Sequence, residues 1–328
     1  MVRALLLERT GDGALRCTVQ QLDDAALPAG NVVVDVQYSS LNYKDGLSIS
    51  GAARIARSFP IVPGIDLAGV VRESGDARFA AGDAVVLTGY GIGERHWGGY
   101  TERTRVSADW LVPLPAPLTL RQAMVIGTAG FTAMLAVMAL ERAGVTPRGG
   151  EVLVSGGGGG VGGVAIALLA RRGYRVVAAS GRPELGDYLR ELGATAVIER
   201  GVLSAPGKPL ESERWAGAID TVGGDTLAGI IRGLAYGGAV AACGNAGGAT
   251  LATTVFPFIL RGAQLIGIDS VQCPAEPRRA AWRRLADDLN AAQLERLAHE
   301  IGLADVPHYA SEIVAGRVRG RVVVDVRR

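Results

Sequence analysis

Val152-Leu153-Val154-Ser155, followed by Gly156 to Gly160, Val161, Gly162 and Gly163, is the stretch of this chain that decides its fold. A short apolar run ends in glycines, and the apolar residues 164–169 have helical character, so the stretch predicts a strand, a tight turn and a helix. A helix N-terminus offers unpaired backbone N–H groups and the positive end of a dipole, which suits a diphosphate. Glycines allow positive φ and a close approach of the ligand. The alternative, a flexible linker, is not expected between a buried strand and an apolar helix.

Strand signals recur after the turn at 175–179, 196–198, 217–222, 238–243 and 265–268, and helical signals at 161–172 and 183–192. Such alternation predicts parallel βαβ units with helices on both faces of a doubly wound sheet. The first third has short apolar or alternating runs separated by Gly, Pro, Asp and Ser, which predicts a barrel-like β domain. The apolar run 322–326 is assigned back to that domain. We therefore predict an α/β protein whose β domain covers 1–123, whose doubly wound domain covers 124–295 and whose return to the β domain covers 296–328.

Bulk composition limits the classes of function. The chain has 328 residues, 48% of them hydrophobic, and a net charge of +2 with no long Lys/Arg cluster, so no nucleic-acid partner is expected. The apolar stretch 120–143 is interrupted by Gly127 and Gly130, so no membrane partner is expected either. Three widely spaced cysteines suit a reducing cytoplasm rather than a disulfide framework.

The tip of the second predicted strand indicates which nucleotide binds. It ends Ala178-Ala179-Ser180-Gly181-Arg182, without the carboxylate that would bind the ribose 2′-hydroxyl of NAD. Ser180 can donate a hydrogen bond to a 2′-phosphate, and Arg182 can pair with it through charge. The tip therefore favours NADP(H). The alternative for Arg182 is a solvated surface arginine.

Several motifs carry a resemblance to a known family. In one frame the glycine turn reads Gly156-x-x-Gly159-Gly160-Val161-Gly162, and with the Ser180 tip it resembles the medium-chain dehydrogenase/reductases. Further segments resemble the acrylyl-CoA reductase branch, also called YhdH-type quinone oxidoreductases: 39–47 (SSLNYKDGL), 63–69 (PGIDLAG), 96–99 (HWGG), 126–133 (IGTAGFTA), 215–223 (WAGAIDTVG), 242–244 (ACG) and 257–261 (PFILR). The resemblance covers essentially the whole chain. It implies a GroES-like β-barrel catalytic domain and a Rossmann NADPH-binding domain.

The resemblance also implies an activity, the NADPH-dependent reduction of the C=C bond of an acryloyl thioester to the propanoyl thioester. It implies a homodimer as well. The residues that it implies as cofactor contacts are Tyr43, Gly159, Gly160, Val161, Gly162, Ser180, Gly181, Arg182, Arg200, Asn245, Ile259, Ser270 and Arg317.

Zinc-dependent members of this superfamily use a Cys/His/acid set, with a His-Glu pair in the loop after Pro-Gly. Here Pro63-Gly64 is followed by Ile65-Asp66 and no cysteine lies nearby, so a catalytic zinc site is not expected. Without a Lewis acid, reduction of an activated double bond is preferred over alcohol oxidation. Hydride goes to the β-carbon, charge develops on the carbonyl oxygen, and the α-carbon requires a proton.

Asn42, Tyr43 and Asp45 are the predicted catalytic residues. The amide of Asn42 can donate to the developing charge, and Tyr43 offers a stacking face and an acidic hydroxyl, although water remains an alternative proton source. Asp45 could orient the loop, or belong to a structural turn. Arg54 and Arg57 are candidates for the phosphates of CoA, with surface solubility as their alternative. An NADPH:quinone reductase and a non-catalytic NADPH-binding sensor remain the alternative functions.

Overall fold

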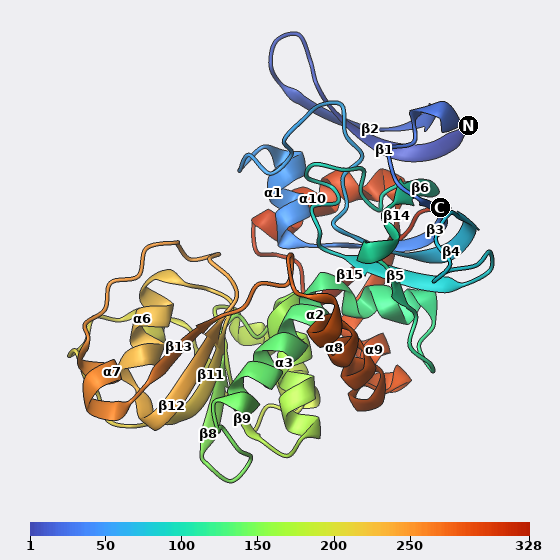
Figure 1. Ribbon diagram of the computed structural model, residues 1–328. Coiled ribbons are helices and arrows are strands. Elements are labelled where there is room, and N and C mark those ends of the chain that lie inside the picture. The colour runs from blue at the N-terminus through green and yellow to red at the C-terminus, as the bar shows by residue number, and fades with distance from the viewer. The chain divides into compact units, whose positions relative to one another are not determined.

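The computed structural model describes residues 1–328, and the chain divides into two compact units (Figure 1). Unit 1 comprises Met1–Thr128, Ser270–Ala286 and Asn290–Arg328, and unit 2 comprises Ala129–Asp269 with Asp287–Leu289. This division differs from the predicted return at 296, because the segment from Ser270 already packs with unit 1. Arg278 is 1% exposed and donates to the Thr88 carbonyl of unit 1 at 2.6 Å, which ties the segment there.

Unit 2 is built on six parallel strands in the order β10-β9-β8-β11-β12-β13, which is the predicted doubly wound sheet. The strands are β8 (Glu151–Val154), β9 (Arg175–Ser180), β10 (Ala196–Glu199), β11 (Trp215–Asp220), β12 (Leu234–Ala242) and β13 (Gln264–Gly267). The helices are α3 (Gly160–Arg171), α4 (Gly186–Glu191), α5 (Gly201–Ser204), α6 (Gly224–Arg232) and α7 (Phe256–Arg261), and Pro183–Leu185 forms a 3₁₀ turn. Residues 152–154 are fully buried, as expected for a central parallel strand covered on both faces.

Unit 1 is rich in antiparallel strands, ordered β14-β15-β3-β4-β5-β7, with β6 paired to β3 and a separate β1-β2 pair. Their bounds are β1 (Val2–Arg9), β2 (Leu15–Leu22), β3 (Val32–Leu41), β4 (Asp66–Ser74), β5 (Ala84–Thr88), β6 (Arg103–Val106), β7 (Val112–Pro113), β14 (Ala298–Gly302) and β15 (Arg321–Asp325). The helices are α1 (Tyr43–Ser50), α8 (Ala275–Asp288), α9 (Ala291–Leu297) and α10 (Val306–Val314), with 3₁₀ turns at Asp24–Ala26, Ala108–Trp110 and Leu303–Asp305. The closing strand β15 pairs antiparallel with β3, with Val322 opposite Leu41.

Helix α2 (Leu120–Arg142) carries the chain from unit 1 into unit 2 and is broken at Gly127, where φ is 49° and ψ is −160°. Its most apolar 18-residue window has a mean hydropathy of 2.0, so α2 is long and apolar enough to cross a membrane by length and composition alone. The sequence analysis expected this apolar stretch to be interrupted at Gly127, and the break in α2 lies at that residue. The window is 89% buried inside the protein, and a helix of this composition occurs in protein cores as well as in membranes.

Candidate active site

The glycine turn of unit 2 leads from β8 into α3, as predicted. Gly156 has a φ of +61°, and a Cβ at Gly162 would lie 2.3 Å from the carbonyl oxygen of Gly156, so both positions require glycine. Gly159 is the N-cap of α3, and no side chain caps this helix. The backbone N–H groups of its first turn, which include those of Val161 and Gly162, therefore form an anion-binding arrangement.

A buried carboxylate fixes the base of this turn. Asp220, at the end of β11, is fully buried and accepts a hydrogen bond from the Ser155 hydroxyl at 2.6 Å and another from the Gly223 backbone N–H at 2.8 Å. The backbone N–H of Thr221 donates to the Ser155 hydroxyl at 2.9 Å. Burial raises the pKa of Asp220. The sequence analysis missed this pair, although polar residues that end two neighbouring parallel strands are a usable signal.

The tip of β9 brings together four predicted residues. The Ser180 hydroxyl accepts from the Arg182 backbone N–H at 3.0 Å, and the Arg182 guanidinium donates to the Gly158 carbonyl at 3.2 Å. The Arg200 backbone N–H donates to the Ser180 carbonyl at 3.0 Å. The Arg200 guanidinium lies 3.3 Å from the point that a Cβ on Gly181 would occupy. Two guanidinium groups therefore stand at the tip of a strand that has no carboxylate there.

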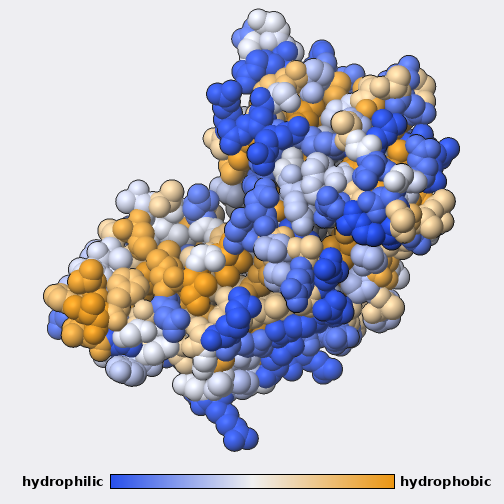
Figure 2. Space-filling model, viewed as in Figure 1, coloured by the Kyte–Doolittle hydropathy of each residue, from blue (hydrophilic) through white to orange (hydrophobic).

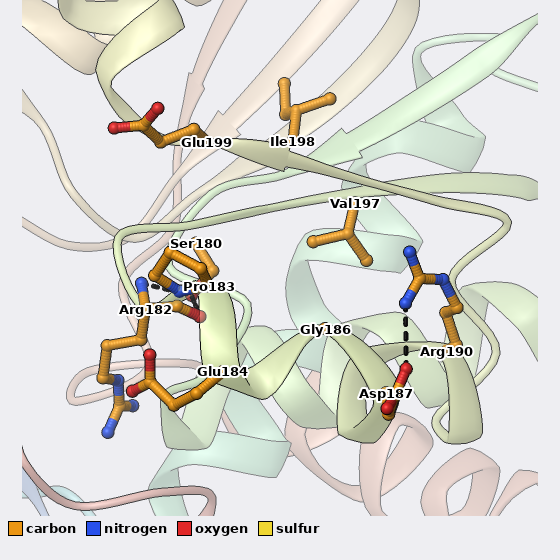
Figure 3. Close-up of a pocket in the computed structure, with 10 residues that line it drawn as sticks. All are labelled: Ser180, Arg182, Pro183, Glu184, Gly186, Asp187, Arg190, Val197, Ile198 and Glu199. Carbon is orange, nitrogen blue, oxygen red and sulfur yellow. Dashed lines mark hydrogen bonds and ion pairs between the residues drawn. The ribbon is translucent and has the colours of Figure 1, made fainter.

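A surface hollow of about 380 Å³ lies beside this tip (Figure 3). Its lining residues are Ser180, Arg182, Pro183, Glu184, Gly186, Asp187, Arg190 and 197–199. Arg182 and Arg190 lie at opposite ends of the view, and Arg190 pairs with Asp187 at 3.1 Å (Figure 3). The hollow thus carries charges of both signs, with Arg182 on the side of the glycine turn.

The remaining predicted cofactor residues lie in separate segments of both units. In unit 2, Asn245 is exposed in the loop after β12, and Ile259 is 68% exposed on α7. In unit 1, the Ser270 carbonyl accepts from Arg278 at 3.0 Å, and Arg317 is paired with Glu312.

The predicted catalytic residues surround the start of α1 in unit 1. Tyr43 is the first residue of the helix and is 37% exposed. Asp45 is buried, and its two carboxylate oxygens accept from the backbone N–H of Asn42 at 2.9 Å and of Ile65 at 3.0 Å. Asp45 therefore fixes the helix start that carries Tyr43.

Asn42 is 7% exposed, and its amide faces the interior of unit 1. The amide nitrogen donates to Asp66 at 2.8 Å, and the amide oxygen accepts from Arg321 at 3.1 Å. The polar atoms of Asn42 and Asp45 therefore have buried partners, and Tyr43 is the exposed polar side chain of the three predicted catalytic residues. The sequence analysis missed Arg321, whose only signal was a charge at the start of an apolar run.

Arg54 and Arg57 are both exposed in the segment after α1. The Arg57 backbone N–H donates to the carbonyl of Glu94 at 2.8 Å, and the Glu94 carboxylate pairs with Lys44 at 2.8 Å. This segment is therefore tied to the helix that carries Tyr43. His96 is a packing residue, because its ring nitrogens contact two backbone carbonyls at 3.0 and 3.1 Å and its ring lies edge-on to Trp110.

Comparisons with known proteins place the chain in a family. A family model described as alcohol dehydrogenase GroES-like domain matches residues 28–116, and one described as zinc-binding dehydrogenase matches residues 160–289. AcuI of Escherichia coli (strain K12), named a probable acrylyl-CoA reductase, is 54% identical over 99% of this chain and 100% of its own. AcuI of Ruegeria pomeroyi, named an acrylyl-CoA reductase, is 53% identical over 99% of each chain.

Solved structures agree with the sequence comparisons. The yhdH oxidoreductase from Salmonella enterica in complex with NADP is 54% identical and covers 98% of this chain and 99% of its own, with a TM-score of 0.97. The yhfP protein of Bacillus subtilis with NAD bound is 45% identical and covers 99% of each chain, with a TM-score of 0.95.

A GroES-like domain joined to a doubly wound nucleotide-binding domain defines the medium-chain dehydrogenase/reductases. Within that superfamily, this chain belongs to the acrylyl-CoA reductase branch. The predicted family and fold are thereby confirmed, and the chain is an oxidoreductase.

The residues present do not fit the zinc that the name of one family model implies. No group of three or more His, Cys, Asp or Glu residues could hold a metal ion. Asp66 lies in the segment after Pro63-Gly64, where the sequence analysis looked for a zinc ligand. It is surrounded by the hydroxyl of Ser40, the amide of Asn42 and, at 3.9 Å, the guanidinium of Arg321. A guanidinium already supplies the positive charge beside this carboxylate.

The pKa of Asp45 predicts a pH dependence of stability. Burial, with the nearby Asp66 carboxylate as the second cause, raises the pKa of Asp45 from 3.8 to about 7. Between about pH 4 and pH 7 the native state therefore keeps a proton on Asp45 that the unfolded chain has lost. The contribution of this protonated carboxyl group to the free energy of unfolding is complete below pH 4 and is lost as the pH rises towards about 7. Thermal unfolding should show that, across that pH window, the free energy of unfolding of the wild type falls by at least about 1 kcal/mol relative to that of Asp45→Asn. The reason is that a tenfold difference in proton affinity is worth about 1.4 kcal/mol.

Asp187→Asn is the control, because this side chain is 96% exposed and its curve should run parallel to that of the wild type. A constant difference between the wild type and Asp45→Asn across the window would contradict the assignment.

Proposed function

We propose that this protein is a zinc-independent, NADPH-dependent enoyl reductase that converts acryloyl-CoA to propanoyl-CoA. The observation that carries the proposal is the 53–54% identity to acrylyl-CoA reductases over the whole chain. The poor fit of the residues around Asp66 to zinc supports a reaction that needs no Lewis acid.

NADPH is the cofactor, in agreement with the NADP held by the Salmonella relative. The N–H groups at the start of α3 suit its diphosphate. Arg182 and Arg200 at the tip of β9 suit the 2′-phosphate, because guanidinium groups pair with phosphate through charge-assisted hydrogen bonds. The B. subtilis relative was solved with NAD bound and the Salmonella relative with NADP, so the preference for NADPH over NADH needs a test, and the tip of β9 is where we test it.

The residues of unit 1 account for the rest of the reaction. Bound NADPH supplies a hydride for the β-carbon, and the α-carbon then needs a proton while charge develops on the thioester oxygen. Tyr43 positions the nicotinamide or delivers that proton, and its exposure at the start of α1 supports either role. Asp45 and Asn42 act as positioning residues, since they hold the helix start that carries Tyr43. Arg54 and Arg57 bind phosphate groups of CoA, which their exposure after α1 supports.

We also propose that the chain forms a homodimer through an apolar patch on unit 2, made of Val255, Phe256, Ile259, Leu260 and Leu265. These large side chains are between 39% and 68% exposed, and Figure 2 shows hydrophobic residues gathered over the part of unit 2 that carries α7. The patch includes β13, the edge strand of the sheet, whose unpaired backbone groups suit a second copy. Ile259, predicted as a cofactor contact, belongs to this patch.

A reducing, cytoplasmic location is proposed as well, and the three free cysteines support it. The absence of nucleic-acid and membrane partners stays a prediction.

An acceptor comparison tests the activity. We expect steady NADPH oxidation with acryloyl-CoA, matched by propanoyl-CoA formation and unchanged after dialysis against a chelator, and no oxidation without an acceptor. Turnover with a quinone alone would favour the quinone reductase. NADPH binding without turnover on either acceptor would favour the sensor.

In the same assay, replacing Arg54 and Arg57 with alanine should raise KM for acryloyl-CoA but not for acryloyl-pantetheine, which lacks the nucleotide phosphates.

Replacing Arg182 or Arg200 with alanine tests the cofactor preference. Each change should raise the Kd of NADPH about tenfold or more, the size of a hydrogen bond to a charged group, while the Kd of NADH stays nearly constant. Arg190→Ala is the matched control, since Arg190 lines the same hollow but pairs with Asp187. Cofactor fluorescence titration gives both constants, and an unchanged NADPH/NADH ratio would rule out the assignment.

Leu260→Asp tests the apolar patch. A charge in the centre of a buried interface should convert the dimer to a monomer in light scattering coupled to gel filtration. Val202→Asp is the control, because Val202 is equally exposed in unit 2 (59% against 58%) but lies on α5, outside the patch. A wild-type monomer, or a dimer that survives Leu260→Asp, would sink the proposal.

A further inference from the structure

We propose that the buried pair of Arg321 and Asp66 positions Tyr43 at the start of α1. The pair binds the side-chain amide of Asn42, next to Tyr43, and also binds the residues on both sides of the break in α2. The inference rests on the proposed function, because it assigns these two residues to the same reaction.

Arg321 holds the first half of α2 and the end of β3. Its side chain is 2% exposed, and its Nε donates to the carbonyl of Val125 at 3.0 Å. The two Nη atoms donate to the Asn42 amide oxygen at 3.1 Å and to the Ser40 hydroxyl at 2.7 Å. Val125 lies just before the break at Gly127, so the guanidinium caps the carbonyl end of a helix segment, where a positive charge is favourable.

Asp66 holds Thr128, the residue that follows the break in α2. Its fully buried carboxylate accepts from the Thr128 backbone N–H at 2.9 Å and from the Thr128 hydroxyl at 2.5 Å. Thr128 is the first residue after the break, so the carboxylate caps the N–H end of the second segment, where a negative charge is favourable. The Ser40 hydroxyl donates to Asp66 at 2.5 Å and thereby bridges the carboxylate to Arg321.

Gly127 brings the helix backbone directly onto this pair. Its φ of 49° and ψ of −160° form a conformation that only glycine adopts readily. A Cβ there would lie 2.6 Å from both the Arg321 Nη2 and an oxygen of Asp66. The break in α2 and the charged pair therefore fit each other.

The pair reaches Tyr43 through Asn42. The amide oxygen of Asn42 faces Arg321 and its nitrogen faces Asp66, so the two charges select one orientation of the amide. Asn42 is the N-cap of α1, and Tyr43 is the next residue. A guanidinium can bond Val125, Ser40 and Asn42 at once because its donors form a rigid fork, whereas a lysine ammonium cannot reach all three.

A double-mutant cycle in kcat tests this chain of contacts. Arg321→Lys should lower kcat for acryloyl-CoA about 100-fold, since small misplacements cost that much, and should leave KM for NADPH within about threefold. Asn42→Ala should lower kcat similarly, and the double variant should be no slower than the slower single variant, because both changes break the same chain. Arg327→Gln is the control, since this exposed arginine at the same end of the chain should leave kcat unchanged.

Hydrogen exchange of the full chain gives a readout that does not depend on turnover. Arg321→Lys should raise exchange in residues 42–50 and 124–132 and leave 151–171 unchanged, and Thr128→Val, which keeps the arginine, should raise exchange in 42–50 as well. Multiplicative losses in kcat, or an exchange increase confined to 124–132, would overturn the proposal. If the wild type does not reduce acryloyl-CoA, the proposed function fails, while the exchange result still decides whether the pair positions the loop.

Discussion

A carboxylate and a guanidinium buried side by side form the interaction on which unit 1 depends. Burying two charges costs several kcal/mol each, and removing one partner of such a pair typically destabilises a protein by about 3–5 kcal/mol. Asp66 and Arg321 offset that cost with hydrogen bonds from Ser40, Asn42 and Thr128 and to the helix backbone. The two charged groups therefore bind neighbouring elements as well as each other. It joins a strand, a helix break and the loop before α1, and each of these would otherwise leave polar groups unpaired.

The corresponding constraint in unit 2 is the fixed position of the backbone N–H groups at the start of α3, which suit an anion. Glycines allow the backbone of Gly162 to pack against the carbonyl of Gly156 in this turn. Asp220, on the neighbouring strand, holds the base of the turn through hydrogen bonds from Ser155 and Gly223. The charge at the tip of β9 carries the proposed preference for NADPH over NADH. Arg182 and Arg200 lie at this tip, while Glu184 and Glu199 carry negative charge beside it, so the proposed preference depends on where the guanidinium groups point rather than on net charge.

Local patterns predicted much of this structure. The apolar run before Gly156 and the alternating strands and helices predicted the doubly wound sheet, because periodicity and turn residues act over short distances. The partners of Asn42 and Asp45 were not predicted, since Asp66, Arg321 and Ile65 are distant in sequence and the burial of these contacts has no local signal. The packing of the segment from Ser270 with unit 1 has no local signal either, because it depends on Arg278 reaching Thr88.

The pairing of β15 with β3 has a consequence for synthesis on the ribosome. Val322 lies opposite Leu41, so β3 is synthesised long before the strand that it pairs with. The continuous segment of unit 2, Ala129–Asp269, is complete long before that, and domains generally fold as units as they emerge. Unit 2 can therefore be native while β3 still lacks β15, and an incomplete chain that stops before residue 321 exposes that edge of β3 to aggregation.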